Sequence, residues 1–188
     1  MRGTLMAEKD IIDLLLADHR EFRELFPQLR EASGKEREEL FHYLVARLAS
    51  HEAAEESVVH PALRDDVPGG EEVAISVLQE EADAEQLLHR MTKMEVDSDE
   101  FAAALGHLER DVLAHADHEE RDEFPRIREH LDVTHRREMG RAFTTLRQSG
   151  PTRPHPRTPQ APEIRAAVGP MVGIFDRARD AARDAFKR

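Results

Sequence analysis

Four long helical patterns with very short breaks between them constrain the fold more than any other feature of this sequence. Apolar residues recur at steps of three and four, the spacing of helices that bury one face. The patterns cover residues 7–32, 36–66, 70–95 and 98–130. The breaks contain Ser33-Gly34 and Pro68-Gly69-Gly70, which are typical of helix ends. Because short connections make consecutive helices antiparallel, we predict an all-α protein, an up-down-up-down four-helix bundle.

The remainder of the chain predicts one more helix and a separate tail. A helical pattern covers residues 132–148, and the proline-dense segment SGPTRPHPRTPQAPE follows it. Such a segment cannot be helical and indicates an extended strap. Residues 171–187 then return to a short, amphipathic, basic helical pattern. We therefore divide the chain into a bundle with its fifth helix (1–148) and a tail (149–188), which we expect to dock on the bundle, a second copy or a protein partner.

Composition and charge exclude several classes of protein. The 188 residues include no cysteine, so a metal would have to be held by nitrogen and oxygen. The net charge is −12, with about +4 on residues 151–188 and −16 on residues 1–150. Because so acidic a body repels phosphate, we expect no binding of nucleic acid.

The N-terminal region predicts neither a secretory signal nor a membrane anchor. Its apolar run is interrupted by Asp13 and Asp18, it lacks the pattern of a cleavage site, and no stretch of the chain is long enough to span a bilayer. We expect a cytoplasmic protein without a membrane partner.

An internal repeat relates the two halves of the predicted bundle. The segments HEAAEESVVHPAL, which begins at His51, and HADHEERDEFPRI, which begins at His115, share the pattern His-x3-Glu-Glu-x4-Pro. The helices around His19 and Glu81, which precede them, also correspond in apolar spacing. This repeat predicts two related helical hairpins that face each other.

Polar residues interrupt the apolar face of each of the four helices at similar depth. They make up the candidate metal ligands: His19, His51, Glu55, Glu81, His115 and Glu119, with Glu85 as a further candidate at the edge of its stripe. Burying an isolated ionised carboxylate costs on the order of several kcal/mol, and the group can avoid this cost by becoming protonated. A shared cation would offset this cost. A buried network of His-Glu hydrogen bonds, or polar faces turned to water, remains the alternative.

The His19 helix and the two His-x3-Glu pairs, each followed by a proline, resemble the hemerythrin HHE cation-binding family over about residues 7–130. The tail resembles that of an actinobacterial subgroup. The resemblance implies a four-helix bundle with a non-haem di-iron centre, oxo- or hydroxo-bridged, which binds or reacts with dioxygen, peroxide or nitric oxide. The three histidines would be imidazole ligands, and Glu55 and Glu119 would be bridging or chelating carboxylates.

One departure from the family pattern bears on function. The family usually has histidine on the third helix where this chain has Glu81, and some members carry a second histidine where Glu85 stands. A donor set richer in carboxylates stabilises ferric iron and favours turnover over oxygen carriage. We therefore predict a protein that reacts with peroxide, dioxygen or nitric oxide. A single-ion or degenerate site, a non-enzymatic iron or oxygen sensor or storage module, and a metal-free interaction protein are the alternatives; zinc or manganese could replace iron.

Several neighbouring residues receive a structural interpretation. We expect His118 at the surface or beside a ligand, and His60 in a packing position near the site. Glu52, Glu56 and Glu120 are expected to face solvent, although one could orient an imidazole. Pro27 should kink or end the first helix.

Overall fold

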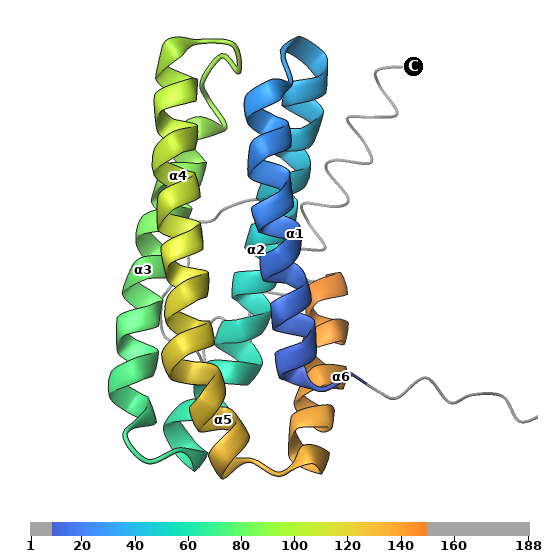
Figure 1. Ribbon diagram of the computed structural model, residues 1–188, viewed down its shortest axis with the longest axis vertical. Helices are drawn as coiled ribbons and strands as arrows, with labels where there is room; N and C mark the ends of the chain where they lie inside the picture. Colours follow the sequence, from blue (N-terminus) through green and yellow to red (C-terminus); the bar gives the residue numbers. More distant parts are fainter. Residues whose placement is uncertain (1–8, 150–188) are drawn as a thin grey trace, which may run out of the picture.

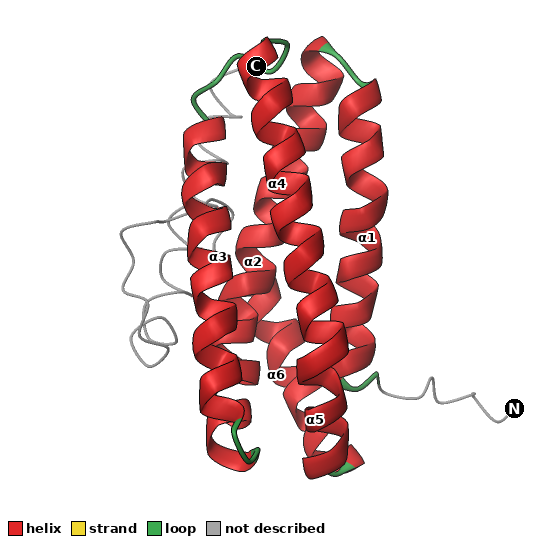
Figure 2. Ribbon diagram, turned by 60° about the vertical axis from the view of Figure 1, so that its left-hand side comes forward, coloured by secondary structure: helices red, strands yellow, loops and turns green. Residues whose placement is uncertain are grey.

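The computed structural model describes residues 9–149 of the chain. These residues form helices and no strand, which confirms the all-α prediction (Figures 1 and 2). None of the described helices is long and apolar enough to cross a bilayer. The proline-rich strap and the helix expected at 171–187 lie outside the described residues.

Four helices form the bundle; the first three follow the predicted spans to within four residues, whereas the fourth ends well before the predicted residue 130. They are α1 (Ile11–Glu31), α2 (Gly34–Asp66), α3 (Gly70–Met91) and α4 (Asp99–His118). In Figure 1 the chain turns between α1 and α2 at one end of the bundle, between α2 and α3 at the other, and between α3 and α4 at the first again. α1 lies beside α2 and α4, and α3 beside α2 and α4.

Local sequence explains where these helices begin and end. Asp10 caps α1, because its side chain accepts a hydrogen bond from the Asp13 N–H while the Asp13 side chain accepts one from the Asp10 N–H. Gly34 (φ +56°) and Gly69 (φ +71°) adopt left-handed backbone conformations at the two tight turns. Pro27 was predicted to kink or end the first helix; it does not end it, since α1 continues to Glu31.

The fourth predicted helix contains an interruption that the sequence pattern did not indicate. α4 is followed by a π-helix, η1 (Glu119–Glu123), and then by α5 (Phe124–His130). In a straight α-helix, the row of side chains that faces the core would have continued to Arg126. The wider π-helical turn shifts this row by one residue. Ile127 is therefore buried and Arg126 is exposed. π-helical turns occur frequently at functional sites.

The last described helix, α6 (Val133–Ser149), packs against α1 and α2 (Figures 1 and 2). Its Phe143 is fully buried and belongs to the apolar core. α6 therefore forms a wall of the bundle interior rather than an appendage.

Two apolar clusters fill the interior, one toward each end of the bundle. One cluster joins the C-terminal half of α1 to the N-terminal halves of α2 and α4, with Phe26, Phe41 and Phe101 at its centre. The other joins the N-terminal half of α1 to the C-terminal half of α2, α5 and α6, with Leu15 and Phe124. The predicted site residues lie between these clusters, where apolar packing excludes water.

Candidate metal centre

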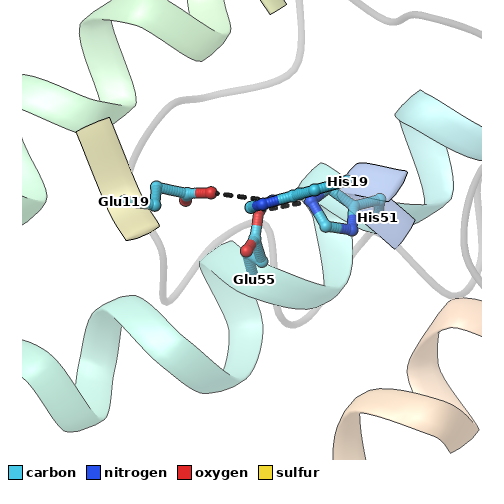
Figure 3. A group of neighbouring side chains, drawn as sticks. All are labelled: His19, His51, Glu55 and Glu119. Atoms are coloured by element: carbon cyan, nitrogen blue, oxygen red, sulfur yellow. Dashed lines mark ion pairs between the residues drawn. The ribbon is translucent and has the colours of Figure 1, made fainter. Parts of the chain in front are cut away.

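The first group of polar side chains comprises His19, His51, Glu55 and Glu119, all buried (Figure 3). One potential ligand atom from each lies within 4.8 Å of those of the others. Nε2 of His19 is 3.1 Å from Oε2 of Glu119, and Nε2 of His51 is 3.0 Å from Oε2 of Glu55. Helices α1 and α2 and the start of η1 thus converge on one point.

A second group comprises Glu52, Glu55, Glu81 and His115, again with ligand atoms within 4.8 Å of one another. Glu52 is partly accessible, with 19% of its side chain exposed, and the other three are buried. Glu55 belongs to both groups, so one carboxylate adjoins two potential ion positions. Nε2 of His115 also lies 3.5 Å from Oε1 of Glu119. This contact joins His115 of the second group to Glu119 of the first group.

Each of the three histidines is held at its other nitrogen by a carboxylate. The contacts are His19 Nδ1 to Glu120 Oε1 (2.9 Å), His51 Nδ1 to Asp18 Oδ2 (3.1 Å) and His115 Nδ1 to Glu80 Oε2 (3.1 Å). A carboxylate in this position fixes the tautomer with the proton on Nδ1. Nε2 therefore faces the site and would be the atom that binds a metal, as in many metal-binding histidines.

Several buried polar atoms have no hydrogen-bond partner among the described residues. They include both carboxylate oxygens of Glu55, Glu81 and Glu119, and Nε2 of His19 and His115. Buried polar groups are nearly always satisfied, because each unsatisfied one costs about 1–3 kcal/mol. Metal cations bound by the two groups would provide partners for these atoms, so the residues present fit a metal centre.

Asp18 connects the first group to α6. It accepts hydrogen bonds from Arg47 Nη2 (2.8 Å) and from Arg147 of α6, which contacts both carboxylate oxygens. Asp18 is itself buried, with 3% of its surface exposed. Two guanidinium groups therefore compensate the negative charge of the residue that orients His51.

Electrostatics in the metal-free site favour charged histidines. Burial alone would lower the pKa of His51 and His115, but the carboxylates of Glu55 and Glu119, respectively, outweigh it. They raise the pKa of His51 well above its ordinary value and the pKa of His115 to about 10. Burial acts against ionisation of Glu119 too, yet His115 and His19 lower its pKa to about 2. Burial and neighbouring carboxylates raise the pKa of Glu81 well above its usual range.

Comparison with known proteins identifies the family to which this chain belongs. A family model described as the hemerythrin HHE cation-binding domain matches residues 10–127. The chain belongs to the hemerythrin HHE cation-binding family. Among solved structures, it is similar to a hemerythrin HHE cation-binding domain-containing protein from Mycobacterium kansasii, with 21% identity and a TM-score of 0.66 over 74% of this chain and 86% of that one. No curated protein matches the sequence.

The HHE domain brings most of the predicted site residues together. His19, His51, Glu55, Glu81, His115 and Glu119 all belong to the two groups described above. Glu85 is half-buried and belongs to neither. The family match extends to Ile127, so α6 with its Arg147 lies beyond it.

Some of the residues around the candidate ligands lie where the sequence predicted, and others do not. His60 is fully buried beside the site, and Glu120 orients His19. His118 is 21% exposed and contacts Glu80, which places it beside a residue that orients a ligand. The prediction that Glu56 faces solvent was wrong, because only 1% of its surface is exposed. Glu52 is likewise only partly accessible and joins the second group.

Sequence reasoning did not identify Asp18, Glu80 or Glu123 as parts of the site. Asp18 and Glu80 each precede a candidate ligand, His19 or Glu81, by one residue, a spacing that places them beside the inward stripe. The sequence offers no further signal for either one, because the histidines that they contact are 33 and 35 residues away. Glu123 follows Glu119 by one turn, and extension of the α4 stripe by four residues would have included it.

Proposed function

We propose that this HHE domain holds two iron ions in the polar layer of its core and reacts with peroxide. One ion would be held by His19, His51, Glu55 and Glu119, and the other by His115, Glu81, Glu52 and the shared Glu55. The observation that carries the proposal is the common orientation of the three imidazoles. Each is fixed by a carboxylate at Nδ1, and each directs Nε2 toward carboxylates that lack other partners among the described residues.

The donor set favours iron in its oxidised state. Three imidazoles and four carboxylates form a hard, anionic set of nitrogen and oxygen ligands, which stabilises ferric over ferrous iron. Bound iron would supply one-electron redox chemistry toward a small oxidant. We therefore propose turnover of peroxide ahead of reversible dioxygen carriage, with dioxygen and nitric oxide as further reactants to be tested.

The chain's own residues would position the ions, exclude bulk water and handle protons. Phe124 stacks on His19 with 5.7 Å between ring centroids, and Phe22 lies edge-on to His51 at 5.2 Å. These aromatic walls close the first position. The second position is more accessible, because Glu80 beside His115 is 40% exposed. A small neutral molecule such as hydrogen peroxide would enter most directly from this side.

The first test is iron loading and peroxide turnover by the full-length protein. We expect at least two irons per chain after anaerobic ferrous loading, and oxygen release when peroxide is added. Glu55→Gln, which alters the carboxylate shared by both groups, should reduce the iron content below one ion per chain and abolish turnover. Glu129→Gln changes an exposed glutamate of α5 and serves as the matched control.

The possible results separate binding from reaction. Wild-type protein with clearly fewer than two irons per chain, or full loading of Glu55→Gln, would contradict the two-ion centre. Stable loading without consumption of peroxide would contradict the proposed reaction and favour a sensor or storage module.

A further inference from the structure

A third group of buried side chains adjoins the two-ion centre. His60, Glu119 and Glu123 are each fully buried, and one ligand atom from each lies within 4.8 Å of those of the other two. Ligands about 2.0–2.2 Å from one ion can be at most about 4.4 Å apart, so a small adjustment would allow these three to share a cation. Neither His60 nor Glu123 belongs to the two groups proposed above.

Glu123 provides the independent observation that points to a ligand. Its side chain is 0% exposed, and neither carboxylate oxygen has a hydrogen-bond partner among the described residues. The π-helical turn of η1 carries Glu119 at its start and Glu123 at its end. A completely buried and unsatisfied carboxylate is expensive to retain unless a positive charge lies beside it.

The third group is linked to both of the others by shared carboxylates. Glu119 belongs to the first and third groups. Glu81 belongs to the second group, and its Oε1 lies 3.2 Å from Nε2 of His60. Glu55 already joins the first group to the second. The three potential ion positions are therefore connected pairwise, each pair through one glutamate.

The balance of charge also favours a third cation. The three groups contain five glutamates, Glu52, Glu55, Glu81, Glu119 and Glu123, in a layer enclosed by apolar residues. When the two-ion centre holds divalent ions, it neutralises four of these carboxylates if all are ionised. A third divalent ion beside Glu123 would offset the remaining negative charge, which lowers the cost of enclosing the layer.

We propose that His60, Glu119 and Glu123 form a third cation site, with Glu81 at its edge, for a divalent first-row transition ion such as zinc or ferrous iron. An imidazole with carboxylates suits these ions better than magnesium or calcium, which prefer oxygen ligands alone. This inference rests on the proposed two-ion centre, since it shares Glu119 and Glu81 with that centre. The third ion would stabilise the π-helical turn and hold Glu119 in position.

The test counts zinc ions per chain by native mass spectrometry of the full-length protein, with anomalous scattering from zinc-soaked crystals to locate them. Zinc is a suitable probe because it binds nitrogen and oxygen ligands without redox change. We expect three zinc ions in the wild-type protein and two in both His60→Phe and Glu123→Gln. Phenylalanine is a conservative choice at position 60, because Phe124 stands at the equivalent position of the second repeat. Glu129→Gln should retain three ions.

Each result has a distinct meaning. Three ions in the wild type, two in the variants and an anomalous peak between His60 and Glu123 would support the third site. Retention of two ions would also show that the variants are folded. Two ions in the wild type and in both variants would overturn the third site and leave the two-ion centre intact. Loss of every ion from both variants would also overturn an independent third site. Fewer than two ions in the wild-type protein would instead contradict the proposed function itself.

Discussion

The two repeat-related segments, 51–61 and 115–125, have the same sequence pattern but different surroundings. His51 is 1% exposed, and the carboxylate that orients it, Asp18, is buried and bound by two arginines. His115 is 7% exposed, and its partner Glu80 has 40% of its side chain exposed. The surroundings of His51 are therefore closed and charge-compensated, and those of His115 are more accessible.

The backbones of the two segments differ as well. Both contain a proline ten residues after the histidine, yet the first segment is part of the continuous α2, whereas the second includes the π-helix η1. Proline alone therefore does not impose the wider turn. α6 packs against α1 and α2, and its Phe143 lies edge-on to His51 of the first segment.

Removal of the two histidines should produce the largest effects. His51→Ala and His115→Ala should each lose bound metal, because each removes an imidazole from one group. We expect His51→Ala to lower the free energy of unfolding of the metal-free protein by about 3 kcal/mol, and His115→Ala by about half as much. The difference follows from the tighter enclosure of His51 between Phe22 and Phe143. Chemical denaturation with metal analysis measures both; equal destabilisation would refute the difference in enclosure.

Metal affinity should rise steeply with pH. Because the pKa of His115 is raised to about 10, its imidazole is protonated in the metal-free protein at pH 7, and the raised pKa of His51 acts in the same direction. Each ion must displace a proton, so the affinity should increase about tenfold per pH unit for each proton released, until the pH exceeds about 10. Calorimetry in buffers of different ionisation enthalpy would count the protons. Binding without proton release would contradict the prediction.

The same pKa shifts predict how the stability of the metal-free protein varies with pH. The raised pKa of His115 contributes stability that is complete below its unfolded value of 6.5 and is lost as the pH rises to about 10. The lowered pKa of Glu119 contributes stability that is present above 4.5 and is lost as the pH falls to about 2. Burial also raises the pKa of Glu81, and the stability that this carboxyl contributes is lost as the pH rises above 4.5. Thermal melting across this range should therefore show a maximum near pH 4.5, and a flat profile would be inconsistent with this charged network.

Asp18 and Glu80 hold Nδ1 of His51 and His115, respectively, so substitutions of these two carboxylates can be compared directly. Asp18→Asn should reduce metal affinity by about 10–100-fold and destabilise the protein by about 3 kcal/mol, because two arginines lose a buried partner. Glu80→Gln should reduce affinity by at most about tenfold and change stability by less than about 1 kcal/mol, since Glu80 is partly solvated. Competition with a chelator and denaturation would distinguish them. Equal effects would mean that exposure does not govern the role of the orienting carboxylate.

The smallest expected change comes from α6. Arg147→Gln removes one of the two guanidinium groups on Asp18 and leaves Arg47 in place. We expect metal affinity to fall by about three- to tenfold, with the spectrum of the ion nearest His51 shifted and that of the ion nearest His115 unchanged. Arg141→Gln, on the same helix but exposed, is the control. An identical effect of both variants would show that α6 acts only through packing.

The helices and most of the candidate ligands could be predicted because they depend on local periodicity. The apolar stripes located α1, α2 and α6 to within four residues, and they located the interruption at Glu81 without any knowledge of the fold. The two His-x3-Glu pairs are set by residues one turn apart on one helix, so their common face follows from helical geometry alone.

Other features depended on contacts between helices. Asp18 meets His51, and Glu80 meets His115, only because the helices are rotated and shifted relative to each other by their packing. No local pattern reports that rotation, and for the same reason Glu56 was wrongly expected at the surface. The π-helical turn also followed from tertiary packing, since the second repeat contains it and the similar first repeat does not.

The sequence by itself therefore determined an all-α chain with two inward His-x3-Glu pairs and a third helix bearing Glu81, because helical period and residue type are local properties. The tertiary structure decided which carboxylate orients each histidine, how accessible each histidine's surroundings are, and that His60 and Glu123 are buried beside Glu119. These are matters of distance between separate helices, and the distance is set by how their apolar faces pack.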